Sequence, residues 1–110
     1  MSNSIEYRNE DGKRHRTDGP AIICPDGSES WWVNGQLHRT DGPAAIYPDG
    51  SESWWLNGDL HRIDGPAIMY PAGREEWWLV GIRYTFNEYV EKMNWSEDQI
   101  IEWKLTHANT

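Results

Sequence analysis

The residues best suited to chemistry form a His-Arg-x-Asp set that occurs three times, at a period of 23 residues. The three sets begin at His15, His38 and His61. A histidine, an arginine and an aspartate held together could relay a proton, bind a phosphate or bind a metal ion. The alternative is structural: the Asp caps the Asp-Gly-Pro turn, while the His and Arg hydrogen-bond to loop carbonyls or stack on Trp. We favour the structural alternative.

The spacing of these sets argues against catalysis and against a metal centre. If each sequence unit adds two strands about 4.8 Å apart, equivalent side chains lie about 10 Å apart, whereas two nitrogens bound to one zinc ion lie within about 4 Å of each other. A reaction also needs one asymmetric site, and this set is triplicated. We therefore expect no enzyme activity, no catalytic residue, no metal site and no cofactor.

The single cysteine, Cys24, cannot form an internal disulfide, and the chain contains no CxxC motif. It stands where the other units have Tyr47 and Tyr70, so we expect a structural substitution rather than a nucleophile. Proteins without disulfides are typical of a reducing compartment. The first six residues contain no apolar segment of the kind found in signal peptides, and no window is apolar enough to span a membrane. We expect a cytoplasmic protein.

Pairs of adjacent tryptophans recur at the same period as the His-Arg-x-Asp sets. The pairs are Trp31 with Trp32, Trp54 with Trp55, and Trp77 with Trp78. Neighbouring residues of a strand point to opposite faces, so each face of a sheet would receive a row of Trp. Either both rows are core, or one row is partly exposed as a binding or dimer surface.

The middle of the chain is the best candidate for binding, because the outer units must also serve as caps. Arginine and tryptophan are the side chains most enriched at binding hot spots. The candidate binding residues are His38, Arg39, Trp54, Trp55, His61 and Arg62.

β-Hairpins must position these residues. Residues 15–37, 38–60 and 61–83 align without a gap. In the second unit, an apolar strand over 44–47 is followed by the turn Pro48-Asp49-Gly50 and an aromatic strand over 51–56. Pro48 suits position i+1 of a type I turn, and Gly50 supplies the positive φ of a bulged hairpin. We expect a ten-residue connection over 57–66.

The chain ends differ from the middle as caps should. Residues 1–14 are interpreted as a half-repeat or cap, 15–84 as three hairpin repeats, and 85–110 as a helical cap, all within one domain. Thr85 and Ser96 are expected to N-cap two helices. The predicted fold is mainly β: a single-layer antiparallel meander of about seven strands with a C-terminal helical tail. The aliphatic residues of the first strands are expected in the core: Ile22, Ile23, Ile46, Ile68 and Met69.

The composition limits the class of partner. The 110 residues carry a net charge of −8 and include eight Trp but one Phe. An acidic chain repels phosphates at long range, so direct DNA or RNA binding and attraction to membranes are disfavoured. The partner is expected to present a neutral or basic surface.

The repeat resembles the MORN family of hairpin repeats. Counting from Trp32, the motifs Asn34-Gly35, His38, Asp49-Gly50 and Trp55 fall at +2/+3, +6, +17/+18 and +23. The form HRxDGPA…DGxxxWWxNG looks similar to variant repeats in uncharacterised proteins of bacteriophages and giant viruses. The resemblance implies a non-catalytic protein–protein interaction module, and in a viral setting an inhibitor of a host protein in the host cytoplasm. The partner could also be a second copy of the chain, in a homodimer. The alternative function is a nucleotide or small-ligand binder that uses Trp stacking and Arg/His loops, and the third and least favoured is a metal-dependent enzyme.

Overall fold

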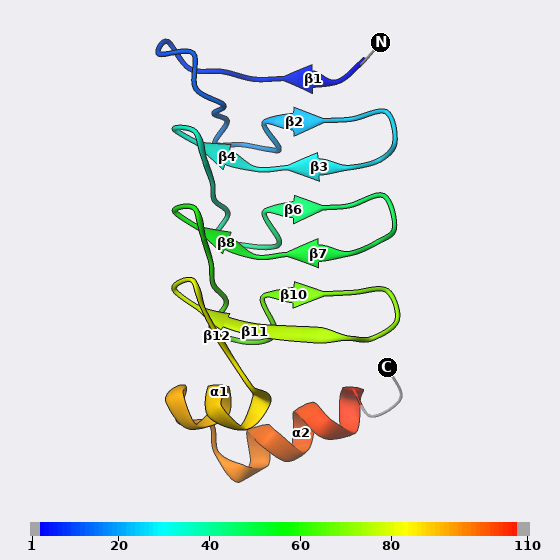
Figure 1. Cartoon of the computed structure of the whole chain (residues 1–110), viewed down its shortest axis with the longest axis vertical. Helices are drawn as coiled ribbons and strands as arrows, with labels where there is room; N and C mark the ends of the chain where they lie inside the picture. Colours follow the sequence, from blue (N-terminus) through cyan, green and yellow to red (C-terminus); the bar gives the residue numbers. More distant parts are fainter. Residues whose placement is uncertain (1–2, 108–110) are drawn as a thin grey trace.

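A computed structural model describes residues 3–107 as a long antiparallel sheet followed by two helices (Figure 1). The sheet has eight strands in the order β1-β2-β3-β6-β7-β10-β11-β12. Its strands are β1 (Ile5–Glu6), β2 (Ile22–Ile23), β3 (Glu29–Ser30), β6 (Ala45–Ile46), β7 (Glu52–Ser53), β10 (Ile68–Met69), β11 (Glu75–Leu79) and β12 (Ile82–Tyr84). Two small hairpins join β4 (Trp32–Val33) to β5 (Gln36–Leu37), and β8 (Trp55–Leu56) to β9 (Asp59–Leu60). A mainly β meander with a helical tail is confirmed.

The turns at one side of the sheet have the predicted chemistry. Gly50 has φ 92°, in the region that favours glycine. Its N–H donates to the carbonyl of Tyr47 at 3.0 Å, and the N–H of Tyr47 donates to the carbonyl of Ser51 at 2.9 Å. These bonds close the hairpin around a Pro-Asp turn, as expected for a type I turn followed by a bulge.

The predicted ten-residue connection over 57–66 is wrong, because its first residues form a second hairpin. Asn57 and Gly58 have φ of 51° and 84° and join β8 to β9. Two successive positive φ angles define the two-residue turn whose twist matches that of a β-hairpin. The same turn occurs at Asn34-Gly35, and Val80-Gly81 repeats it with φ of 47° and 77°. Each unit therefore supplies more short strands than expected.

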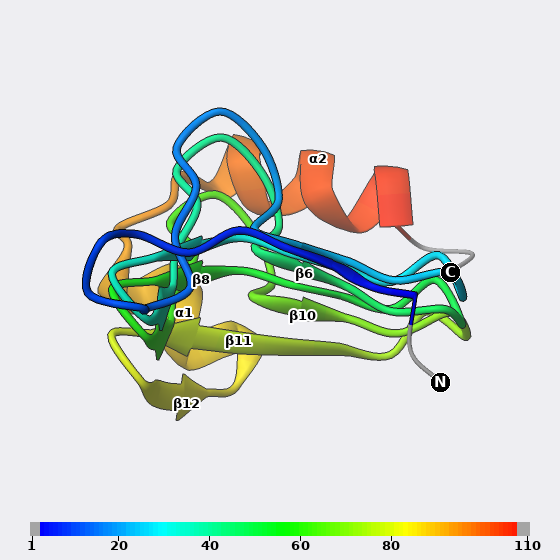
Figure 2. The same cartoon turned by 90° about the horizontal axis from the view of Figure 1, so that it is seen from above.

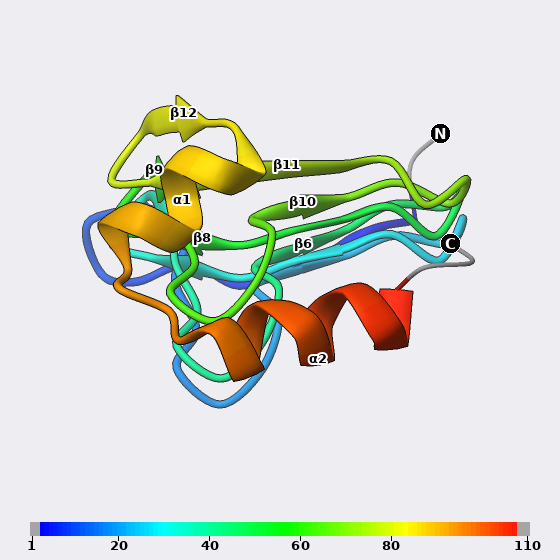
Figure 3. The ribbon, with the colours of Figure 1, turned by 90° about the horizontal axis from the view of Figure 1, so that it is seen from below.

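The sheet is one layer thick, and its two faces differ. The strand register places five side chains on one face, which we call the open face: Ile22, Ser30, Ala45, Ser53 and Ile68. Trp32 and Trp55 each follow a serine of this set by two residues and share its face. The loops that connect successive units and the second helix lie on the other side, the covered face (Figures 2 and 3).

The predicted core of large aliphatic residues is only partly correct. Ile22, Ile23, Ile46, Ile68 and Met69 are half-buried. The alanines that follow each Gly-Pro pair are fully buried, and so is Pro66: Ala21, Ala44 and Ala67 have no exposed surface. A single-layer sheet has no second sheet to cover its large side chains, so away from the helices the buried residues are mostly small ones close to the backbone.

The main apolar cluster lies at the C-terminal end, where α1 (Phe86–Lys92) and α2 (Glu97–His107) meet the sheet. Its centre is Trp77, and its ring centroid lies 5.0 Å from Phe86, 4.7 Å from Tyr89, 6.1 Å from Trp95 and 5.2 Å from Trp103. These tilted and edge-on arrangements are the favourable ones for aromatic pairs. The helices therefore cover the last strand pair, as predicted.

Both helix starts follow the sequence prediction. The Thr85 hydroxyl accepts from the N–H of Glu88 at 3.1 Å, while the Glu88 carboxylate accepts from the N–H of Thr85 at 2.8 Å. Ser96 and Gln99 make the same reciprocal pair at the start of α2, at 3.1 and 2.7 Å. These capping boxes satisfy backbone donors that a helix leaves unpaired. In the described part of the chain, neither helix is long and apolar enough to cross a membrane.

Candidate binding surfaces

The arginine of each His-Arg-x-Asp set lies flat on an aromatic ring of the unit before it. The Arg39 Cζ is 3.9 Å from the centroid of Trp31, and the Arg62 Cζ is 3.9 Å from that of Trp54. Arg16 makes the equivalent contact with Tyr7 at 4.4 Å. Such cation–π contacts contribute about 0.5 to 2 kcal/mol, more when the pair is shielded from water.

The same guanidinium groups are held by hydrogen bonds within their own loop. Arg39 Nε donates to Asp41 Oδ1 at 2.8 Å, and Arg39 Nη1 donates to the carbonyl of Pro43 at 3.1 Å. The hydrogen bond from Arg39 lowers the pKa of the Asp41 carboxyl below its ordinary value. Arg62 repeats this pattern with Asp64 and Pro66 at 2.9 and 3.1 Å. The arginines are therefore fixed parts of the loops.

Each histidine binds a turn of its own unit. His38 Nδ1 accepts from the backbone N–H of Asn57 at 3.0 Å, and His61 Nδ1 accepts from that of Val80 at 2.9 Å. Both donors lie in the positive-φ turns described above. As an acceptor, Nδ1 carries no proton, so the ring in this arrangement is the neutral Nε2–H tautomer. Each histidine thus orients the two-residue turn near the end of its own unit. This is a structural role, as favoured, but the ring accepts from a backbone N–H, which is not the predicted bond to a loop carbonyl.

The six candidate residues do not form one site. Arg39, Trp54, His61 and Arg62 line a groove of about 300 Å³ on the covered face, together with Thr40, Leu56, Ile63 and Asp64. His38 instead holds the turn at Asn57. Trp55 points to the open face. No group of three or more His, Cys, Asp or Glu residues that could hold a metal ion occurs within residues 3–107.

A second row of tryptophans lies on the open face. The indole N–H of Trp32 donates to Ser30 Oγ at 2.8 Å, that of Trp55 donates to Ser53 Oγ at 2.8 Å, and that of Trp78 donates to Glu76 Oε1 at 3.0 Å. All three Trp side chains are half-buried. Each ring is therefore fixed in orientation while part of it remains in contact with solvent. One of the two interpretations of the Trp pairs, a partly exposed row, fits this arrangement.

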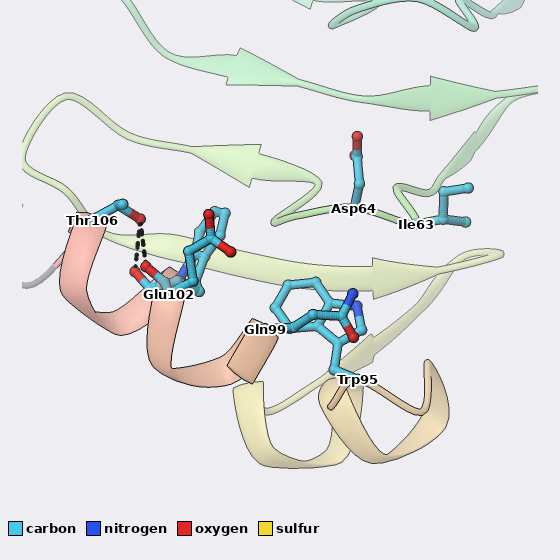
Figure 4. A pocket seen from close by; sticks show the side chains of 7 residues that line it. Ile63, Asp64, Trp95, Gln99, Glu102 and Thr106 are labelled. Atoms are coloured by element: carbon cyan, nitrogen blue, oxygen red, sulfur yellow. Dashed lines mark hydrogen bonds between the residues drawn. The ribbon is translucent and has the colours of Figure 1, made fainter. Parts of the chain in front are cut away.

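Two hollows accompany these surfaces. On the open face, Trp32, Leu37, Ala45 and Tyr47 belong to the lining of a mostly apolar hollow of about 250 Å³. On the covered side, a hollow of about 330 Å³ separates α2 from the loop at Asp64 (Figure 4). The sequence could not predict the second hollow, because it exists only where α2 docks beside a loop distant in sequence.

Comparisons with known proteins do not assign the chain to a family. No protein-family model matches the chain, and no curated protein or solved structure matches it either. The argument for function therefore rests on the geometry of the two faces.

Proposed function

We propose that the chain is a non-catalytic, repeat-built protein-binding module that docks a partner protein on the open face of its sheet. The observation that carries this proposal is the row of Trp32, Trp55 and Trp78, which are partly exposed on a face that no helix of the described chain covers. Exposed aromatic patches usually mark interfaces. The resemblance of the sequence units to MORN repeats supports the same class of function.

The row suits a binding surface because its side chains are already ordered. Each indole is held by one hydrogen bond to the side chain two residues before it. A partner would therefore lose little side-chain entropy of this chain on docking, which is a major cost of association. The net charge of −8 favours a partner with a neutral or basic surface. If the chain is viral, as the resemblance implies, the partner is a host protein.

The experiment compares the wild type with two surface variants. Each is used as bait in a pull-down from a lysate of the cell that expresses the protein, and the amount of each retained protein is measured. Tyr47→Arg places a charge on the open face at a side chain that is 45% exposed, and Ile63→Arg does so on the covered side at one that is 60% exposed. Both variants should keep the circular dichroism and melting temperature of the wild type, because surface changes cost little stability. We expect the proteins retained by wild type and Ile63→Arg to be lost with Tyr47→Arg. Equal retention by both variants would contradict the open face as the docking surface.

A small-ligand site is the second candidate, and the groove around Trp54 favours it. Four of the six candidate residues line this groove, which has about 300 Å³ of space. The proposed ligand is a nucleotide whose base stacks on an aromatic ring and whose phosphate contacts arginine N–H groups. Isothermal titration calorimetry with linear and cyclic nucleotides tests it. Thr40→Tyr would fill the groove and abolish binding, while Thr17→Tyr is the matched control one unit earlier.

A further inference from the structure

The outer edge of β1 presents backbone N–H and C=O groups in the same pattern as those that hydrogen-bond successive units inside the sheet. Tyr7 is the equivalent of Trp31: its N–H donates to the carbonyl of Ala21 at 2.8 Å, as the N–H of Trp31 donates to that of Ala44 at 2.6 Å. Arg16 also stacks on Tyr7, as Arg39 stacks on Trp31. The strand that contains β1 is therefore in the same register as the second strand of a full unit.

This register shows where the backbone groups of the neighbouring residues point. Because the N–H of Tyr7 points toward β2, the backbone groups of Glu6 and Arg8 point away from it. In the next unit, the equivalent residues are Ser30 and Trp32. Their carbonyls accept from the N–H groups of Ala21 and Arg16, each at 2.9 Å. In the described sheet β1 is outermost, so Glu6 and Arg8 offer this pattern at an open edge.

We propose that this edge pairs with the same edge of a second copy of the chain, as an antiparallel β1–β1 contact centred on Tyr7. In this register, Glu6 of each copy lies directly opposite Arg8 of the other. Both residues point their backbone groups outward, so four backbone hydrogen bonds can form across the contact. Opposite charges placed directly across two strands are favourable, and like charges are unfavourable. The neighbouring registers would set Glu6 against Glu6 or Arg8 against Arg8.

The distribution of charge favours contact at this end. Residues 1–14 contain three acidic and three basic side chains, whereas the whole chain carries −8. Two copies that meet through β1 therefore bring together their neutral ends and keep their acidic parts apart. Ile5, which is 52% exposed, lies on the same strand and would lose contact with water in the pair.

The opposite end of the sheet cannot join in the same way, because α1 and α2 pack against β11 and β12 (Figure 1). Pairing through β1 is therefore isologous and stops at a two-fold dimer instead of continuing into a fibre. The described chain measures 47 × 26 × 20 Å, so an end-to-end contact covers at most about 500 Å² per copy. This value lies near the lower limit of about 1,000 Å² in total for a specific interface, and we expect a weak, concentration-dependent dimer.

The proposal is tested by exchanging the charges of Glu6 and Arg8. Sedimentation equilibrium across a concentration series gives the dimer dissociation constant of each variant. Glu6→Arg and Arg8→Glu each place like charges opposite one another and should raise the dimer dissociation constant at least about tenfold. A mixture of the two variants restores opposite charges in a heterodimer, and the double variant Glu6→Arg/Arg8→Glu restores the homodimer. The intrachain ion pairs that these changes remove are on the surface, so the fold should persist.

Arg8→Pro provides a second test that does not depend on charge. It removes one outward N–H while leaving the bond from the Tyr7 N–H to the Ala21 carbonyl in place. We expect a monomer with the circular dichroism of the wild type. The proposal is overturned if the wild type stays monomeric at its highest soluble concentration, or if the single charge variants dimerise as the wild type does. It is also overturned if their mixture does not associate more tightly than either variant alone.

Discussion

At the scale of single residues, each loop arginine makes contacts in three directions. Arg39 stacks on Trp31, pairs with Asp41 and donates to the carbonyl of Pro43. Its loop also brings Gly42 close: a Cβ at this position would lie 2.8 Å from Arg39 Cζ. A side chain at position 42 would therefore displace the guanidinium group that closes the loop.

A double-mutant cycle measures this constraint. Arg39→Ala should lower the free energy of unfolding by about 2 kcal/mol, from the lost stacking and charged hydrogen bonds. Gly42→Ala should cost about 1 kcal/mol or more in the wild type and much less beside Arg39→Ala, because the clash is then absent. Urea unfolding of the four proteins gives the coupling.

Gly50→Ala is the matched control for this cycle. Gly50 has φ 92° and no atom within 4 Å of an added Cβ, so its substitution costs backbone strain alone. That cost should be the same with and without Arg39. Equal costs of Gly42→Ala in both backgrounds would show that the arginine is mobile.

At the scale of elements, Tyr89 joins the first helix to a loop of the sheet. Its side chain is fully buried, and its hydroxyl donates to the carbonyl of Arg62 at 2.5 Å. Burial is the main cause that raises the pKa of Tyr89 to about 12, from an ordinary value near 10. Below about pH 10, the protonated Tyr89 makes its full contribution to the free energy of unfolding. As the pH rises further, the unfolded chain ionises first, so this contribution is lost by about pH 12.

Tyr89→Phe isolates the contribution of this hydroxyl. The wild type should lose about 2 to 3 kcal/mol of stability between pH 10 and 12 from this group, and the variant should lack that component. At neutral pH the variant should be less stable by about 1 kcal/mol, because the Arg62 carbonyl loses its donor. Urea midpoints at the two pH values measure both effects, and parallel pH profiles would refute the assignment.

The two helices should differ in their importance for the fold. α1 contributes the buried Tyr89 and Val90, whereas no described residue of α2 is fully buried. A chain ending at residue 84 should aggregate or bind more of the dye ANS, because Trp77 becomes exposed. A chain ending at residue 95 should not aggregate and should have a lower melting temperature. The prediction fails if the shorter chain does not aggregate, binds no more ANS than the wild type and melts at the same temperature.

The elements with their own local signals could be predicted from the sequence. Thr85 and Ser96 marked the helix starts, and Pro48-Asp49-Gly50 marked a hairpin turn. The β8–β9 hairpin is not evident from the sequence, because Asn57-Gly58 after an aromatic run can either end a strand or form the centre of a turn. For Arg39 the sequence indicates either a loop carbonyl or a Trp ring as partner, since the spacing alone does not show that a loop folds back over the preceding strand.

At the scale of the whole molecule, the chain is elongated. Its Cα radius of gyration is 15.6 Å, against about 13 Å for a compact chain of this length. Each strand of the sheet contacts its neighbours in the order of the chain. Stability in such a one-dimensional arrangement is the sum of units and the interfaces between them.

Hydrogen exchange should therefore form a gradient along the sheet. The amides of β6, β7 and β10 have strands on both sides and should exchange most slowly, while those of β1 should exchange fastest. The outward N–H groups of Glu6 and Arg8 should become protected as the concentration rises, if the proposed dimer forms. Uniform protection across the sheet would contradict the gradient.

The ring cluster around Trp77 also gives the protein an optical property. Trp77, Trp95 and Trp103 lie within 5.2 to 6.2 Å of one another, at fixed angles. Indole transitions at such separations couple, so the folded chain should show an exciton pair in its circular dichroism. The three tryptophans come from β11, from the segment between the helices and from α2. Loss of this signal would report the release of α2 even while the rest of the chain keeps its hairpins.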